Sequence, residues 1–232
     1  MDLLSNASFW FALGSIILTN IILSGDNAVV IALASRNLPP TQQKKAIFWG
    51  SAAAIVLRVV LTITAVALLT LPYLKIVGGL LLLYIGIQLL SDSGGEEHME
   101  AKTSIWAAIR TILIADLVMS LDNVLAVAAA AQKGPEETRL LLLIIGLGMS
   151  IPLIIFGSAM LLKVMERFPI IITLGAGLLG LLAGGMLVDD PAIKDSIQAA
   201  LGDAKLAFEV IGVAIVILVG TYLKKKNAAK AH

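Results

Sequence analysis

Residues 24–30 read Ser-Gly-Asp-Asn-Ala-Val-Val, and residues 120–127 read Ser-Leu-Asp-Asn-Val-Leu-Ala-Val. Each stretch places an acid–amide dipeptide, Asp26-Asn27 or Asp122-Asn123, inside a long apolar run. A helix needs about 20 mostly apolar residues to cross a membrane. The two stretches therefore predict membrane helices that carry acidic side chains at hydrocarbon depth.

The composition of the whole chain supports the same class of protein. Of its 232 residues, 59% are hydrophobic and 14% are charged, and the mean hydropathy is +0.96. A soluble domain carries about 25% charged residues, so this chain lacks the polar surface that a soluble globule needs. The net charge of +1 gives no reason to expect a nucleic-acid partner, and the absence of cysteine excludes disulfides and thiolate metal sites. We expect an integral membrane protein.

The apolar runs are continuous rather than alternating, which predicts an all-α membrane protein instead of a barrel. Residues 1–232 form one transmembrane domain with seven predicted helices, and most of the prolines fall between them. The predicted spans are Phe9–Ala34, Ala46–Leu71, Tyr73–Leu90, Ile105–Ala131, Arg139–Leu162, Pro169–Val188 and Leu206–Leu223.

The positions of lysine and arginine predict the orientation of these spans. Eleven of the 17 basic residues fall on the side of the C-terminus and five on the side of the N-terminus, while Arg58 lies within a span. Loops that remain in the cytoplasm carry the excess of basic residues. We therefore expect the N-terminus outside and the C-terminus in the cytoplasm.

The first six predicted helices contain a repeated pattern, with an offset of 96 residues that becomes 97 after one residue of slippage. The matching pairs are Asn20 with Asp116, Asp26 with Asp122, Gly50 with Gly146, Pro72 with Pro169, Gly78 with Gly175, and Asp92 with Asp189. A three-helix unit crosses the membrane an odd number of times, so its second copy is inverted, as in many secondary transporters. We predict repeats over residues 8–92 and 105–189, and a peripheral seventh helix over 204–224.

Three aspartates lie within the predicted spans: Asp26, Asp116 and Asp122. Ionised and unpaired, they would together cost roughly 8–10 kcal/mol on insertion scales, so a bound cation, protonation or Arg58 must offset the cost. Arg58 is open to three interpretations: a structural counter-ion to an aspartate, a placeholder in an empty cation site, or a side chain that reaches a lipid headgroup.

The residues around these acids favour a cation. Asn20, Ser24 and Asn27 share one helical stripe, and their repeat mates have the same spacing. If the helix loosens near Gly25, the acids and amides converge on an oxygen-only site, which suits Mg²⁺, Ca²⁺ or Mn²⁺. The predicted metal ligands are Asp26, Asn27, Asp122, Asn123, Asp116 and Asn20, with Ser24, Ser120 and Arg58 as supporting residues.

Both motifs, together with seven spans over nearly the whole chain, resemble the TerC family of integral membrane proteins, in its shorter bacterial branch. The resemblance implies a protein of the bacterial cytoplasmic membrane that exports divalent metal, chiefly manganese, and holds no prosthetic group. The family motif corresponds to Asp26, Asn27, Asp122 and Asn123, whereas Asn20 and Asp116 are added from the repeat.

No nucleotide-binding motif is present, so we expect secondary transport, with protons as the exchanged ion, and no enzyme activity. One alternative is an intramembrane aspartyl protease, but its Gly-x-Gly-Asp motif is replaced by residues 23–26, Leu-Ser-Gly-Asp. Another is a membrane partner that delivers metal to secreted enzymes at the secretion machinery. A homodimer stays open, as does weak metal collection by the acidic segment 92–100.

Overall fold

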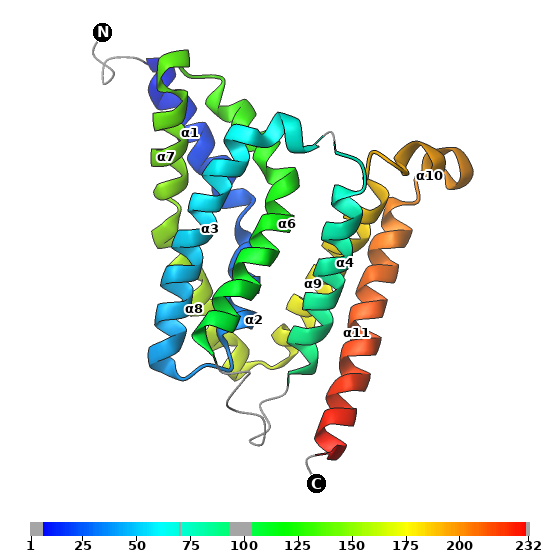
Figure 1. Cartoon of the computed structure of the whole chain (residues 1–232). Coiled ribbons are helices and arrows are strands. Elements are labelled where there is room, and N and C mark those ends of the chain that lie inside the picture. Colours follow the sequence, from blue (N-terminus) through cyan, green and yellow to red (C-terminus); the bar gives the residue numbers. More distant parts are fainter. Residues whose placement is uncertain (1–6, 70, 93–103, 231–232) are drawn as a thin grey trace.

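The computed structural model describes residues 7–69, 71–92 and 104–230, and it is helical throughout, without strands, in that part of the chain (Figure 1). This confirms the all-α prediction. The helices are α1 (Ala7–Ile22), α2 (Gly25–Ser35), α3 (Pro40–Leu69), α4 (Leu74–Ser91), α6 (Ile105–Ala131), the 3-10 turn η3 (Glu136–Thr138), α7 (Arg139–Gly148), α8 (Ile151–Arg167), α9 (Ile170–Val188), α10 (Lys194–Leu201) and α11 (Lys205–Lys230).

Five helical segments are long and apolar enough to cross a membrane unaided: Pro40–Thr64, Leu74–Ser91, Glu136–Arg167, Ile170–Val188 and Lys205–Ala229. Two further pairs qualify when each is taken as one bent span: α1 with α2, bent by 48°, and the two halves of α6, bent by 64°. The prediction of seven spans is thus matched only if each bent pair counts as one. The short helix α10 was not predicted.

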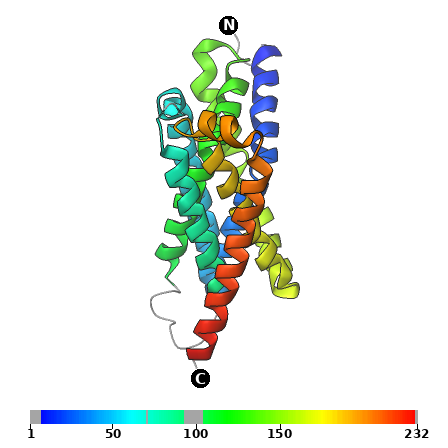
Figure 2. The same cartoon turned by 90° about the vertical axis from the view of Figure 1, so that its right-hand side faces the viewer.

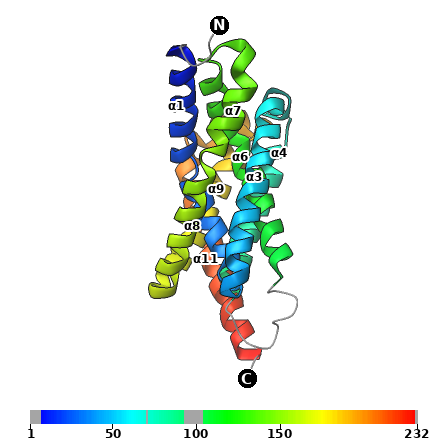
Figure 3. The ribbon, with the colours of Figure 1, turned by 90° about the vertical axis from the view of Figure 1, so that its left-hand side faces the viewer.

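The helices pack in two groups. The first contains α1, α2, α3, α6, α7 and α8, in which α3 lies along α6 and the α7–α8 pair covers the opposite edge (Figures 1 and 3). The second contains α4, α9 and α11, which pack against one another, and α11 extends from below α10 to the end of the molecule where the C-terminus lies (Figure 2). Helix α1 starts at one end of the molecule and α11 finishes at the other, as an odd number of spans requires.

Helix α11 packs backbone to backbone against α9 because both carry glycine where they cross. A Cβ on Gly184 would overlap the backbone oxygen of Phe208, and one on Gly212 would overlap that of Gly180. Small residues allow this approach, which is a common basis for helix association in lipid. The predicted peripheral helix is therefore held closely, although much of its outer surface is exposed.

Asp190, just beyond α9, fixes the start of α4. Its carboxylate accepts backbone N–H groups from Tyr73 (3.0 Å), Lys75 (3.0 Å) and Ile76 (3.2 Å), as well as from Ala192 (2.8 Å). Burial alone would raise the pKa of Asp190, but these four hydrogen bonds favour the ionised form and lower it below its usual value. An anion at a helix N-terminus is also favoured by the helix dipole.

Candidate functional site

The first candidate motif lies where the first span is broken. Leu23 still donates its N–H to Thr19 in a helical bond of 3.0 Å, but Ser24 donates to Ile21 at 3.3 Å, and the helix resumes at Gly25. A Cβ on Gly25 would meet no atom within 4 Å, so the glycine leaves open space beside the break. The predicted loosening of the helix near Gly25 is confirmed.

The break frees a backbone carbonyl that joins the two motifs. The oxygen of Leu23 accepts hydrogen bonds from the amide nitrogens of Asn27 (3.4 Å) and Asn123 (3.3 Å). The other amide atom of Asn27, Oδ1, is buried and has no hydrogen-bond partner. Buried acceptors are nearly always satisfied in proteins, so this oxygen marks a place where a donor or a cation would be stabilised.

Asp26 directly precedes Asn27 in the chain and lies at the start of α2. Its Oδ1 accepts the backbone N–H of Asn27 at 2.8 Å, and the side chain is partly exposed to a cavity of about 130 Å³. Asp26 and Asn123 line one part of the cavity, while Asp189, Lys205 and Glu209 supply its other charged groups. Helices α2, α6, α9 and α11 thus enclose a polar space next to the broken span.

A second polar cluster surrounds Arg58 of α3, which is 1% exposed. Its guanidinium forms an ion pair with Asp116 and donates from Nε to Ser120 Oγ at 3.0 Å. Nη1 donates to Asn20 Oδ1 at 2.8 Å and to Ser24 Oγ at 3.3 Å. The guanidinium is therefore bonded to residues of both the first and the fourth span.

The remaining polar groups of this cluster are also bonded. The amide nitrogen of Asn20 donates to Ser150 Oγ at 2.5 Å, and Ser150 donates to the backbone oxygen of Gly146 at 3.2 Å. Ser120 donates to Asp116 Oδ2 at 3.3 Å. Ser150 was not among the predicted residues, because nothing in its own span distinguishes it before the spans are packed.

The structure thus divides the predicted ligands between two places. Asn20, Ser24, Asp116 and Ser120 lie around Arg58, whereas Asp26, Asn27 and Asn123 lie at the helix break. The side chain of Asp122, like residues 93–100 of the acidic segment, lies outside the described part. Among the side chains that are described, no group of three or more His, Cys, Asp or Glu residues is arranged to hold a metal ion.

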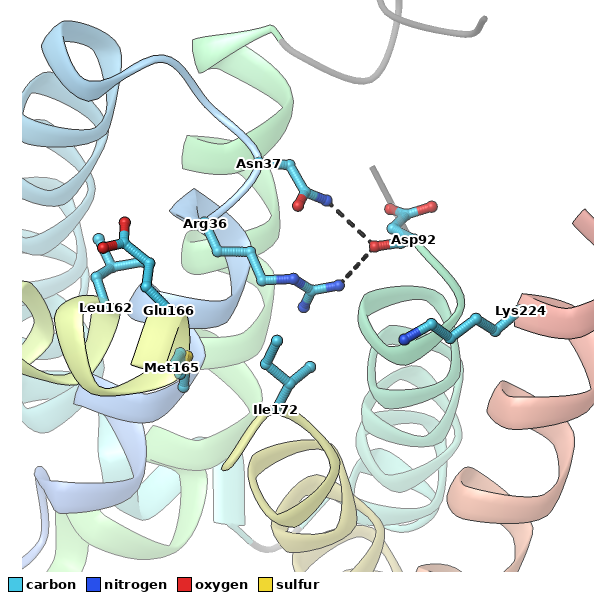
Figure 4. A pocket seen from close by; sticks show the side chains of 8 residues that line it. All are labelled: Arg36, Asn37, Asp92, Leu162, Met165, Glu166, Ile172 and Lys224. Carbon is cyan, nitrogen blue, oxygen red and sulfur yellow. Dashed lines mark hydrogen bonds between the residues drawn. The ribbon is translucent and has the colours of Figure 1, made fainter. Parts of the chain in front are cut away.

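A larger cavity, of about 320 Å³, lies at the opposite end of the molecule (Figure 4). There Arg36, which follows α2, donates to the backbone oxygens of Leu89 (2.5 Å) and Asp92 (2.7 Å) at the end of α4. Burial lowers the pKa of the Arg36 guanidinium, and the carboxylate of Asp92 opposes this shift. Arginine at the carbonyl end of a helix stabilises it, so this contact joins the ends of α2 and α4.

The model of the family described as "Integral membrane protein TerC family" matches residues 5–228, which is nearly the whole chain. The chain belongs to the TerC family. This TerC protein is 43% identical to YjbE of Bacillus subtilis, described as an uncharacterized membrane protein, over 206 residues that cover 89% of the chain and 92% of YjbE.

More distant relatives match a smaller part of their own length. YceF of Bacillus subtilis is 28% identical over 57% of the chain and 55% of YceF. YoaE of Escherichia coli, described as a UPF0053 inner membrane protein, is 30% identical over 54% of the chain and 28% of YoaE. No solved structure matches the TerC protein. Family and helices together identify an integral, multi-pass membrane protein.

Proposed function

We propose that this TerC protein is a secondary transporter that exports divalent cations, chiefly Mn²⁺, across the membrane. The observation that carries the proposal is the buried, unsatisfied oxygen of Asn27, in the residue that directly follows Asp26, whose side chain lines a polar cavity. Irregular backbone within a membrane occurs where it lines a site, and broken helices form the ion sites of many transporters. A cation bound there supplies what the buried oxygen lacks.

The donor atoms favour a hard cation. The carboxylate of Asp26 and the amide oxygens of Asn27 and Asn123 provide oxygen only, and the chain has no cysteine. Such oxygens suit Mg²⁺, Ca²⁺ and Mn²⁺ rather than copper or zinc. The choice of Mn²⁺ among these three comes from the TerC resemblance, and the repeat gives Asp122 the role that Asp26 has in the first copy.

Two glycine contacts support an inverted repeat. A Cβ on Gly50 would lie 2.8 Å from Ile112 Cδ1, and a Cβ on Gly146 would lie 2.5 Å from Ile16 Cγ2. The two glycines are 96 residues apart, and so are the two isoleucines. The second span therefore packs on the fourth in the same way as the fifth packs on the first. Alternating access then results from rocking of one repeat against the other around the site.

The Arg58 ion pair assigns a separate role to Asp116. While the guanidinium holds Asp116 and Asn20, neither is free to bind a metal ion. We therefore take Arg58 as the internal counter-ion of Asp116. Asp116 and Asn20 join the metal ligands only in a state in which Arg58 has released them.

Export of a doubly charged ion must overcome the membrane potential. With the inside negative, this costs about 4.6 kcal/mol per 100 mV, twice the value for a single charge. The sequence has no nucleotide-binding motif that could supply this energy from ATP. Exchange of the metal ion for protons that move inward provides this energy. The orientation that we propose has the N-terminus outside and the C-terminus in the cytoplasm, because the excess of basic residues lies on the C-terminal side.

Purified protein in liposomes tests the proposal. A dye that Mn²⁺ quenches is trapped inside the liposomes, so uptake of Mn²⁺ is measured as loss of fluorescence. Liposomes with the wild-type protein should take up Mn²⁺, and a pH gradient across their membrane should change the rate of uptake. Asp26→Asn should reduce the flux to that of empty liposomes. Asp195→Asn, which removes the same charge from an exposed position on α10, should transport as the wild type does. Undiminished flux in a folded Asp26→Asn variant would rule this site out.

A further inference from the structure

We infer that the cavity beside Asp26 is the route by which the cation passes between the site and the N-terminal end of the molecule, and that Lys205 of α11 restricts its mouth. The inference rests on the proposed function for the identity of the ion. It goes beyond that function because it assigns roles to α9 and to the seventh helix, which has no counterpart in the repeat.

The cavity follows one face of α9. The lining residues of this helix are spaced as neighbours on a single side: Leu181, Leu182, Gly185, Met186 and Asp189. At 1.5 Å per residue, they extend over about 12 Å, or roughly two helical turns. Since Asp189 follows the last residue of α9, the cavity extends to the N-terminal end of the bundle, while Asp26 and Asn123 lie at the broken span.

The charges along this cavity favour cations. Its described lining contains the carboxylates of Asp26, Asp189 and Glu209 and a single ammonium group, that of Lys205. A cleft lined by one sign of charge and bounded by apolar walls concentrates ions of the opposite sign. The cavity should therefore admit divalent cations and exclude anions.

Lys205 and Glu209 reach the cavity because Gly185 has no side chain. A Cβ on Gly185 would lie 3.1 Å from Glu209 Oε1 and 3.5 Å from Lys205 Cε, so both side chains lie across its bare backbone. The two residues are one helical turn apart at the start of α11, where that helix crosses α9. The close glycine contacts between α9 and α11 therefore hold a carboxylate and an ammonium group over the cavity.

An ion pair closes the mouth of the cavity. Lys205 Nζ lies 2.5 Å from Asp189 Oδ2, and the side chains of Lys205 and Asp189 are 49% and 24% exposed. Ion pairs this accessible to water are weak and open readily, which suits a gate better than a structural link. With Lys205 displaced, the described lining of the cavity keeps the carboxylates of Asp189 and Glu209 and no ammonium group.

Cysteine accessibility tests the route, since the natural chain has no cysteine. Met186→Cys places a thiol in the cavity, and Leu182→Cys provides a second reporter should the first fail to fold. Leu179→Cys, buried on the same helix but away from the lining, is the control. Proteoliposomes receive membrane-impermeant methanethiosulfonates, one cationic and one anionic, and Ser196→Cys and Ala228→Cys report which end of the molecule faces the reagent.

We expect the cavity thiol to react from the N-terminal end, about tenfold faster with the cationic reagent, and the Leu179→Cys thiol to remain unmodified. Lys205→Gln should raise the cationic rate severalfold. Lys194→Gln is the matched control, since Lys194 also lies near Asp189, at 3.8 Å. It should leave the cationic rate unchanged because Lys194 does not line the cavity.

Unreactive cavity thiols, equal rates with both reagents, or no effect of Lys205→Gln would overturn the inference. Labelling does not depend on transport, so the two proposals can fail separately. Mn²⁺ flux with an unreactive cavity would leave the proposed function standing without this route. A cavity that is labelled as expected in a protein that moves no Mn²⁺ would contradict the proposed function alone.

Discussion

The first span supplies polar residues to two regions of opposite character. Around Arg58, Asn20 and Ser24 belong to a closed cluster in which the guanidinium is 1% exposed and bonded on every nitrogen. Only a turn further on, Asp26 borders a cavity and Asn27 holds a buried oxygen without a partner.

This difference separates two ways of accommodating charge in a membrane. The aspartate of the closed cluster, Asp116, is neutralised by a fixed side chain, so that region is suited to structural stability. Among the described residues, no guanidinium is hydrogen-bonded to the carboxylate of Asp26, and we propose that this carboxylate binds the mobile cation. The account therefore predicts that substitutions in the first region affect folding and those in the second affect binding.

The largest expected effect comes from separating the Arg58 ion pair. Arg58→Gln or Asp116→Asn leaves a buried charge without its partner, which typically lowers the free energy of unfolding by about 3–5 kcal/mol. The double variant removes both charges and should recover much of the loss. Thermal unfolding in detergent measures this, with Asp26→Asn as the comparison that should unfold near the wild-type temperature. Unchanged melting of both single variants would contradict the structural role of the pair.

A matched pair of asparagine substitutions distinguishes the Arg58 cluster from the helix break, with a smaller effect on the free energy of unfolding than the loss of the ion pair. Asn20→Ala deprives Arg58 and Ser150 of buried hydrogen bonds and should lower the free energy of unfolding by about 1–3 kcal/mol. Asn27→Ala removes an oxygen that has no partner and a long hydrogen bond to the Leu23 oxygen, which still accepts one from Asn123, so stability should change less than in Asn20→Ala while Mn²⁺ binding weakens by about tenfold, or 1.4 kcal/mol. Unfolding and equilibrium Mn²⁺ binding are measured on both variants. The division between the regions fails if Asn27→Ala lowers the free energy of unfolding as much as Asn20→Ala does, or if it leaves Mn²⁺ binding unchanged.

The smallest effect is expected at Asp190, which belongs to neither region. Its folded-state pKa lies below the unfolded value of about 3.9, so its stabilising effect is present above that pH and is lost as the pH falls through the folded pKa. Asp190→Asn should lower the melting temperature by roughly 2–4 °C at neutral pH and reduce its dependence on acid pH. Mn²⁺ flux should stay as in the wild type. A melting temperature that does not change at neutral pH would show that the cap contributes nothing.

Much of the fold follows from patterns within single segments. The apolar run Ile105–Ala131 was predicted with the bounds that α6 has in the structure, because hydrophobic length sets a membrane helix. Loosening of the helix near Gly25 is the condition under which the sequence brings the acids and amides together, and the structure has its break there. These features depend on residues that are neighbours in sequence.

Features that depend on packing could not be predicted in the same way. Arg58 and Asp116 are 58 residues apart, and the sequence left three interpretations of Arg58 open, of which its burial and its ion pair with Asp116 exclude a side chain that reaches a lipid headgroup. The role of Leu23 depends on a backbone carbonyl, which no side-chain pattern reveals. The seventh helix borders the cavity because the glycines of α9 and α11 let the two helices pack closely, and this contact is visible only in the folded structure.

If a divalent cation binds at the broken first span, anomalous X-ray scattering from crystals grown with Mn²⁺ will locate it there. We expect one strong anomalous peak beside Asp26 and Asn27 Oδ1, with oxygen ligands at about 2.2 Å, between the ranges typical of Mg²⁺ and Ca²⁺. The peak should be missing from Asp26→Asn. A peak that persists in that variant, or one that lies only elsewhere in the protein, would contradict the account.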